Sequence, residues 1–195
     1  MTKERQSGRD QLLAATYKVL LSRGYHGVTV DEIIQEAGLS KGAFYHYFKS
    51  KDDLFVEFFE SLADQNLAPL TEKVRSGQGI RETFLNLIDE YSPLLRNVQA
   101  MTFGVEIYLI ALRNPVLQSQ VRRTHEKAMS QLAEIFRIGI ERGELKHGTD
   151  PRKLAERIHY ASRGVMIMEL AIYGGKNLLP KLREFFDETM RLLET

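Results

Sequence analysis

The stretch from Thr29 to Lys51 constrains the fold most, because its 23 residues hold signals for three helix starts separated by tight turns. At its beginning, Thr29 is followed three residues later by Glu32, which is the pattern of a capping box. In a capping box, two side chains satisfy backbone N–H groups that the first turn of a helix leaves without partners. The pattern therefore predicts a helix from Val30 to about Ala37.

A short turn separates this helix from a second one. Gly38 follows the last periodic residue and can take the left-handed conformation that ends a helix. Ser40 can then cap a helix that runs from Lys41 to about Phe48. The turn has three or four residues, as a DNA-reading pair of helices requires, so the sequence predicts a helix-turn-helix.

The second helix carries small, basic and aromatic residues in place of an ordinary amphipathic stripe. Gly42 and Ala43 leave little side chain near its start, so the backbone can approach base edges, and Lys41 can reach a guanine or a phosphate. Further donors at the groove wall come from three aromatic residues, Tyr45, His46 and Tyr47. The alternative is a plain helical hairpin whose aromatic residues belong to the core.

A third helix is predicted to start after Ser50. Lys51 lies in its first turn, where the helix N-terminus and the ammonium together can form a phosphate site. Residues 1–51 hold eight Lys and Arg against five Asp and Glu, a net charge of +3, whereas the rest of the chain carries −2. This basic excess lies on the predicted DNA-reading unit but is small, so binding would need two such units in one complex.

Over roughly Arg9 to Leu54 the sequence resembles the TetR family of transcriptional regulators. The pattern of the family is present in order and without gaps at Leu12, Leu13, Ala15, Leu20, Leu21, Gly24, Thr29, Ile33, Ala37, Gly38, Ser40, Gly42, Tyr45, Tyr47, Phe48, Lys51 and Leu54. Position by position, the resemblance implies DNA contacts from Thr29, Lys41, Gly42, Ala43, Tyr45, His46, Tyr47 and Lys51.

The sequence departs from the family pattern at two positions. Ala43 stands where a threonine or serine is usual, which removes a polar contact and leaves a methyl group that could touch thymine. Ile34 stands where alanine is usual, so bulkier packing is expected between the first two helices of the family unit.

The rest of the chain is helical by periodicity and shows no strand-like alternation. The expected helices run from about Ser7 to Arg23, from Ser50 past a kink at Pro69 to about Val74, from Phe84 to Leu95 with a bend near Pro93, from Met101 to Leu112, from Pro115 to about Arg142, from Pro151 to Tyr173, and from Leu178 to Leu193. We therefore expect an all-α protein of about nine helices. Residues 1–50 would form the helix-turn-helix DNA-binding domain, and a connecting helix would lead into an effector-binding and dimerisation domain at 51–195.

The last helix carries an apolar stripe from Leu178 to Leu193 that is too extensive for a free C-terminal helix. One interpretation is that the last two helices pair with their symmetry mates, because a homodimer would hold two DNA-reading units about 34–36 Å apart, or at a multiple of that distance. The alternative interpretation is that the stripe packs within its own chain.

Polar residues set in apolar helices predict an effector pocket in the C-terminal part. Glu106 and Glu169 lie in apolar surroundings, where an unpaired buried carboxylate would be costly. The full set of candidate lining residues is Tyr91, Phe103, Glu106, Tyr108, Phe136, His159, Ser162, Arg163, Met166, Glu169 and Tyr173. Their methionine and aromatic side chains suit a hydrophobic small molecule, and an uncompensated glutamate favours a cationic one. The equal alternative is that Arg163 pairs with one of the glutamates inside the chain, or that Glu169 points at the dimer rim.

Enzyme and metal signatures are weak. Glu144 with His147 and Glu156 with His159 have the spacing of di-iron bundles, but the first pair lies in a glycine-bounded turn and cannot project inward from a helix. There is no cysteine, and the longest run without Asp, Glu, Lys or Arg is nine residues, so we predict no catalytic residue, no metal, no cofactor and no membrane span.

The expected function is that of a cytoplasmic, ligand-responsive regulator of transcription, which the resemblance implies is most often a repressor. Its partners would be an operator in double-stranded DNA, a hydrophobic effector and a second copy of the chain. Two alternatives stay open: a TetR-like DNA-binding protein without a small-molecule effector, and an all-helical enzyme with a vestigial DNA-reading unit.

Overall fold

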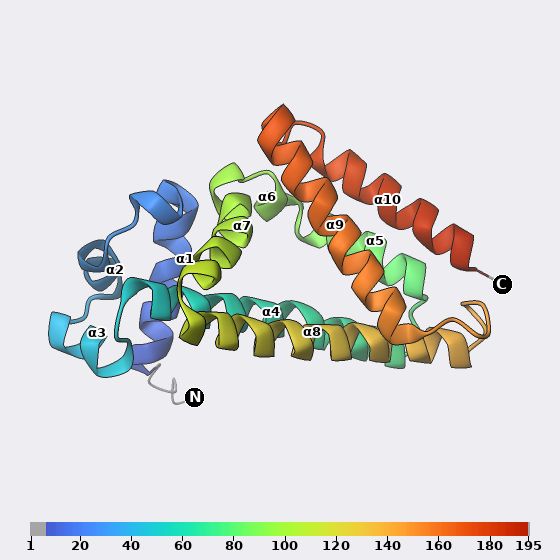
Figure 1. The fold of residues 1–195 in the computed structure, drawn as a ribbon, viewed down its shortest axis with the longest axis horizontal. Coiled ribbons are helices and arrows are strands. Elements are labelled where there is room, and N and C mark those ends of the chain that lie inside the picture. The colour runs from blue at the N-terminus through green and yellow to red at the C-terminus, as the bar shows by residue number, and fades with distance from the viewer. Residues whose placement is uncertain (1–6, 195) are drawn as a thin grey trace, which may run out of the picture. The chain divides into compact units, whose positions relative to one another are not determined.

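A computed structural model describes residues 7–194, apart from the side chains of Asn66 and Gln99. Within that range the regular structure is helical, which confirms the predicted all-α class (Figure 1). The helices are α1 Gly8–Gly27, α2 Val30–Ala37, α3 Lys41–Tyr47, α4 Lys51–Arg75, α5 Ile80–Glu90, α6 Ser92–Leu95, α7 Val98–Arg113, α8 Pro115–Glu141, α9 Pro151–Tyr173 and α10 Leu178–Leu193. None of the helices described is both long enough and apolar enough to cross a membrane.

The helix ends follow the local signals in the sequence. The Thr29 and Glu32 side chains form both bonds of the predicted capping box at the start of α2. Asp150 caps α9 by accepting from the backbone N–H groups of Arg152 and Lys153, with a proline at the first helical position. The predicted bounds of α2, α9 and α10 are therefore confirmed.

The region around Pro93 differs from the prediction of one bent helix. Two separate helices, α5 and α6, meet at Tyr91, whose backbone (φ −91°, ψ 3°) ends the first of them. Pro93 lies in the first turn of α6, where its missing N–H costs nothing. The described range therefore holds ten helices instead of about nine. Pro69 lies inside α4, which continues to Arg75.

The chain forms two compact units. The first comprises the chain up to Ser61 together with Gln99–Val121, and the second comprises Leu62–Val98 and Arg122–Thr195. Helices α4 and α8 each contribute to both units. The functional boundary after residue 50 is a separate matter and stays a prediction.

The first unit has a core in which α7 packs on α4, and α4 in turn packs on α1. Helices α1, α2 and α3 contact one another. The Phe103 ring of α7 lies 5.3 Å from that of Phe55 and 5.7 Å from that of Phe58, measured between centroids, and all three rings are buried. Through α4 the small bundle is therefore supported by a helix that lies some 50 residues further along the sequence, and a unit of this size needs such support for stability.

In the second unit α10 runs beside α5 and α9 (Figure 1). Phe186 of α10 stacks on Phe84 of α5, with ring centroids 5.4 Å apart. Leu178, Leu182 and Met190 are buried on the same side of α10. The apolar stripe of the last helix thus packs within its own chain. Burial of the stripe therefore does not require a symmetry mate.

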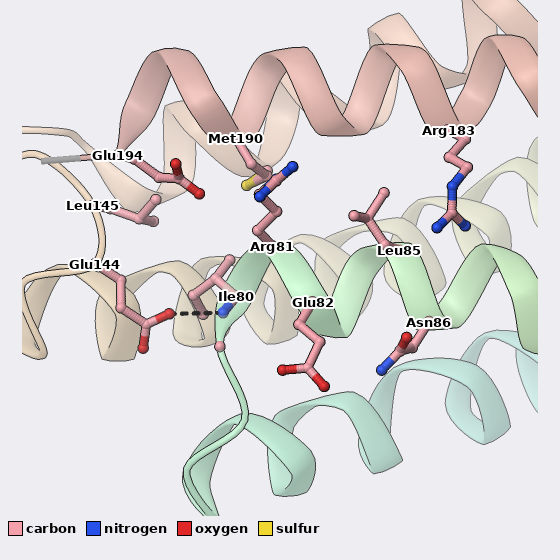
Figure 2. Close-up of a pocket in the computed structure, with 11 residues that line it drawn as sticks. Ile80, Arg81, Glu82, Leu85, Asn86, Glu144, Leu145, Arg183, Met190 and Glu194 are labelled. Atoms are coloured by element: carbon pink, nitrogen blue, oxygen red, sulfur yellow. Dashed lines mark hydrogen bonds between the residues drawn. The ribbon is translucent and has the colours of Figure 1, made fainter.

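The start of α5 is stabilised by the turn between α8 and α9. Gly79 offers no side chain to cap α5, and the Ile80 N–H instead donates to Glu144 Oε2 at 2.8 Å (Figure 2). Glu144 also lies 2.9 Å from the Arg142 guanidinium, which donates in turn to the Gly77 carbonyl. The turn that carries the first Glu-x-x-His pattern therefore has a structural role.

We expect the close contact between α8 and α5 to require glycine at position 139. A Cβ atom at this position would lie 2.6 Å from Ile80 Cγ1 and 3.2 Å from Leu145 Cδ1. We expect Gly139→Ala to lower the free energy of unfolding by about 1–2 kcal/mol, because overpacking exceeds the gain in helix propensity. Thermal and urea unfolding would measure this change.

The matched control is Gly42→Ala, where the added methyl group meets only Ser40 Oγ at 3.8 Å. This variant should unfold at the wild-type temperature or above it, since alanine is the better helix former. If the two variants were equally stable, the side chains of Ile80 and Leu145 would have to move aside at no cost.

Candidate nucleic-acid interface

The angle between α2 and α3 is set by the turn at Gly38. This residue has a left-handed backbone (φ 66°, ψ 31°), and its N–H donates to the Gln35 carbonyl at 3.2 Å. The next N–H, of Leu39, donates to the Ile34 carbonyl at 3.1 Å. Ser40 Oγ then accepts from the Ala43 N–H at 3.1 Å and starts α3. These bonds satisfy two carbonyls at the end of α2 and one N–H at the start of α3, which favours a rigid turn.

Helix α3 has one buried and one exposed side. Phe44 and Phe48, four residues apart, are 0% and 1% exposed and anchor the helix in the bundle. Tyr45 and Tyr47 are 54% and 40% exposed despite their size. Exposed rings on a helix that is anchored from behind can contact a DNA groove, which is the role predicted for them.

The start of α3 is small and accessible. Gly42 has room for a side chain, so packing within the chain does not require glycine there. Lys41 Nζ lies 3.3 Å from Asp31 Oδ1, and both side chains are mostly exposed. An exposed pair of this kind contributes little to stability, so Lys41 can exchange it for a base or a phosphate at low cost.

Two further predicted contact residues also hold the unit together. The Thr29 hydroxyl accepts from the Glu32 N–H and donates to Glu32 Oε2 at 3.0 Å. The Thr29 N–H and hydroxyl donors lower the pKa of Glu32. Tyr47 lies against the start of α1, because a Cβ atom at Gly8 would be 3.1 Å from the Tyr47 ring. His46 is exposed and Ala43 is half-buried.

Lys51 is placed differently from an exposed phosphate contact. Its ammonium donates to the carbonyls of Tyr25 and Val28, both at 3.1 Å, and lies 4.3 Å from the centroid of the Tyr25 ring. The side chain holds residues 25–28, which follow the break in α1 at Gly24 and are called the α1–α2 loop below. The local sequence pattern does not reveal this contact. The predicted phosphate contact stays a prediction and is taken up below.

The predicted effector residues of α7 have partners within the first unit. Phe103 belongs to the aromatic core already described, and the Tyr108 ring lies 6.1 Å from that of Phe59. Glu106 Oε1 lies 3.0 Å from His26 Nε2, with 22% of the glutamate side chain exposed. Glu106 is therefore a paired carboxylate, and its partner comes from the end of α1, 80 residues away.

The predicted effector residues of the second unit lie in different surroundings. Phe136 is fully buried and stacks on Phe84 at 5.5 Å, so it serves the core. His159 lies 5.1 Å from His125 between ring centroids; burial, together with Arg163 and His125, lowers its pKa to about 3. Tyr91 is half-buried, and Tyr173 is 55% exposed.

Glu169 on α9 is a buried carboxylate with one oxygen that accepts no hydrogen bond from the residues described. The residue is 8% exposed, and its Oε2 atom has no hydrogen-bond partner in the described part of the chain. Among the residues described, the Arg163 guanidinium donates to the Met166 sulfur at 3.8 Å, and the Ser162 hydroxyl donates to the His159 carbonyl. Because this oxygen lacks a hydrogen-bond donor, Glu169 is a candidate to bind a positively charged group of a ligand.

A cavity of about 620 Å³ lies between the start of α5, the α8–α9 turn and the C-terminal end of α10 (Figure 2). Its apolar side chains include Ile80, Leu145 and Met190. None of the predicted effector residues lines it. The two arginines in its wall are already paired: Arg81 with Asp187, and Arg183 with Asp89 at 2.6 Å.

Comparisons with known proteins agree with this geometry. Residues 12–58 match the family model described as bacterial regulatory proteins, tetR family. The transcriptional regulator AcuR of Cereibacter sphaeroides is 31% identical over 179 residues, which cover 80% of this chain and 73% of that protein. The fatty acid metabolism regulator protein of Bacillus subtilis is 26% identical over 148 residues, 76% of each chain.

A solved structure has the same fold. The transcriptional regulator FadR of Bacillus subtilis, in complex with stearoyl-CoA, superposes with a TM-score of 0.71 at 23% identity, covering 92% of this chain and 96% of that one. The two chains therefore share their helical architecture over nearly their whole length.

Gly42→Ala should weaken DNA binding without lowering the stability of the protein. The methyl group fits the isolated chain but projects from the accessible start of α3, where the backbone is expected to approach base edges. We expect about tenfold weaker binding to the preferred double-stranded site, together with unchanged or higher thermal stability. Fluorescence anisotropy and a melting curve on the same sample would test this. If Gly42→Ala bound DNA with the dissociation constant of the wild type, the prediction would be wrong and the DNA would have to lie farther from the start of α3.

Proposed function

We propose that this chain, which belongs to the tetR family of bacterial regulatory proteins, is a homodimeric repressor that a hydrophobic small molecule releases from its operator. The observation that carries the DNA-binding part is the anchored helix α3, which is held by Phe44 and Phe48 and presents exposed Tyr45, Tyr47 and Lys41 beyond a rigid turn. The dimer and the effector rest on separate features of α9.

The exposed side of α9 supports the homodimer. Tyr160, Met168 and Ile172 are each more than half exposed, and they share this side with two alanines and with Gly164, which has nothing within 4 Å of its Cβ position. A row of large apolar residues that alternates with small ones is costly to leave in water and suits a second helix. In a two-fold antiparallel pairing of α9 with its mate, Met168 of each copy would lie over Gly164 of the other.

Met168→Glu should separate the subunits, because it places one charge from each copy in an apolar contact. Sedimentation should show a monomer whose circular dichroism is still helical. The matched control is Leu112→Glu at the end of α7, where an apolar residue that is also more than half exposed lies outside the last two helices. That variant should stay dimeric. A dimer that survives Met168→Glu would exclude this side of α9 as the interface.

Glu169 supports an effector that combines an apolar body with a positive charge. A buried carboxylate oxygen without a hydrogen-bond partner is costly, and a bound cation would offset that cost. The apolar and aromatic side chains predicted around it suit a hydrophobic ligand, and the structure of FadR with stearoyl-CoA illustrates that this fold can hold a long hydrophobic molecule. Ligand binding would release DNA by favouring a state in which the two DNA-reading units no longer match the operator.

The test is a thermal-shift screen of hydrophobic quaternary amines and fatty acids, followed by displacement of labelled DNA. A cationic ligand should raise the melting temperature and release DNA, and Glu169→Gln should weaken that ligand about tenfold or more, since it removes one charge-assisted contact. Glu188→Gln, at an exposed site on α10, is the matched control and should bind as wild type. If the ligand released DNA equally well from both variants, Glu169 would have a structural role and would not bind the ligand.

The second candidate function is DNA binding without a small-molecule effector, through protein partners. It is favoured by the partners that the structure gives to Phe103, Glu106 and Phe136, since these predicted pocket residues serve the core or a hydrogen bond to His26. A screen in which no ligand shifts the melting temperature, while DNA binding persists, would support this second function over the first.

A further inference from the structure

Lys51 lies at the junction between the helix-turn-helix and the connecting helix α4. Its ammonium donates to two main-chain carbonyls of the α1–α2 loop, those of Tyr25 and Val28, and faces the Tyr25 ring at 4.3 Å. Two of its three N–H donors are thereby used within the chain. The side chain is part-buried, in contrast with Lys41, which is 65% exposed.

The loop that Lys51 holds connects directly to the DNA-reading helices. Val28 is 2% exposed, and the next residue, Thr29, is the N-cap of α2. At the other end, Gly24 takes a left-handed backbone (φ 66°) that interrupts α1. The loop thus lies between the break in α1 and the N-cap of α2, so contacts that hold it bear on the direction in which α2 begins.

Helix α4 holds the same loop through two further residues of its first two turns. The Tyr25 hydroxyl donates to Asp52 Oδ1 at 2.5 Å, and the Tyr25 ring meets that of Phe55 edge to face at 4.9 Å. Burial, followed by the Asp52 carboxylate, raises the pKa of Tyr25, so the phenol stays protonated and can donate. Lys51 completes this set by fixing the main chain on both sides of the loop.

We infer that Lys51 is a positioning residue for DNA binding, which holds the α1–α2 loop and thereby the direction of α2 and α3, and that it does not neutralise a phosphate. The inference rests on the proposed DNA-binding function. A lysine that contacts phosphate must present its ammonium to solvent, whereas this one is committed to two carbonyls and an aromatic face.

The two roles differ in their dependence on salt. Removing a lysine that neutralises a phosphate means that fewer counterions are released on binding, so the slope of log K against log salt becomes shallower by about 0.9 per phosphate. Removing a positioning residue lowers the fraction of molecules in the binding-competent conformation, and apparent affinity falls by that fraction. The bound state then keeps its phosphate contacts, so the slope is unchanged.

The test uses the full-length protein and a double-stranded site enriched from random DNA by the wild type. Anisotropy over a salt series would compare wild type with Lys51→Met, which keeps the apolar stem and removes the ammonium. We expect about tenfold weaker binding at a temperature where the variant is fully folded, with the wild-type salt slope. Faster amide hydrogen exchange in residues 25–29 should accompany the weaker binding.

Two further variants keep the result decisive. Lys49→Met is the matched control, because it removes an exposed lysine two residues away that does not bridge the loop. Lys51→Arg keeps the charge but presents a planar group that does not fit both carbonyls, so it should also weaken binding without changing the slope. This variant decides the matter if Lys51→Met does not fold.

A shallower slope in Lys51→Met would overturn the inference in favour of a phosphate contact, and so would wild-type binding by Lys51→Arg. If folded Lys51→Met bound DNA with unchanged affinity, Lys51 would contribute only to stability, and the inference would also be overturned. If the wild type enriched no DNA at all, the failure would belong to the proposed function and not to the role of Lys51.

Discussion

The closed turn between α2 and α3 is the constraint on which the DNA-binding unit depends. Gly38 in its left-handed conformation lets the chain reverse in three residues, while its own N–H and that of Leu39 satisfy carbonyls at the end of α2. A residue with a Cβ atom would be strained in this backbone conformation. With that angle set, Phe44 and Phe48 can reach the core and turn the other side of α3 outward.

Support for this unit comes from outside the helix-turn-helix. Phe103 of α7 fills the aromatic core with Phe55 and Phe58, and Glu106 pairs with His26 at the end of α1. The start of α4 holds the α1–α2 loop through Lys51 and Asp52. A change in α4 or α7 can therefore alter the direction of the DNA-reading helices, which gives a physical route by which a ligand could control them.

Local signals in the sequence were sufficient to predict helix ends. The capping box at Thr29, the glycine at 38 and the pair Asp150 and Pro151 act within one turn of the chain, and the structure has each of them as expected. The apolar stripe of α10 could be predicted to be buried, but not what it is buried against. Periodicity indicates which side of a helix avoids water, but either α5 or a symmetry mate could cover that side equally well.

Partners far apart in the sequence could not be predicted from any pattern. Glu106 and His26 are separated by 80 residues, and Lys51 lies 26 residues from the loop carbonyl of Tyr25. Nothing in the local sequence distinguishes a lysine that donates to carbonyls from one that faces a phosphate. Glu169 shows the opposite case, because its apolar surroundings predicted a buried carboxylate and the structure leaves one oxygen without a partner.

Selection from random duplexes tests most directly whether the chain reads double-stranded DNA as a two-fold dimer. Purified protein should enrich inverted repeats whose half-sites are centred about 34–36 Å apart, or a multiple of that distance, since two-fold symmetry in the protein is mirrored in its site. Enrichment of asymmetric single sites, or no enrichment above the starting pool at moderate salt, would contradict the account.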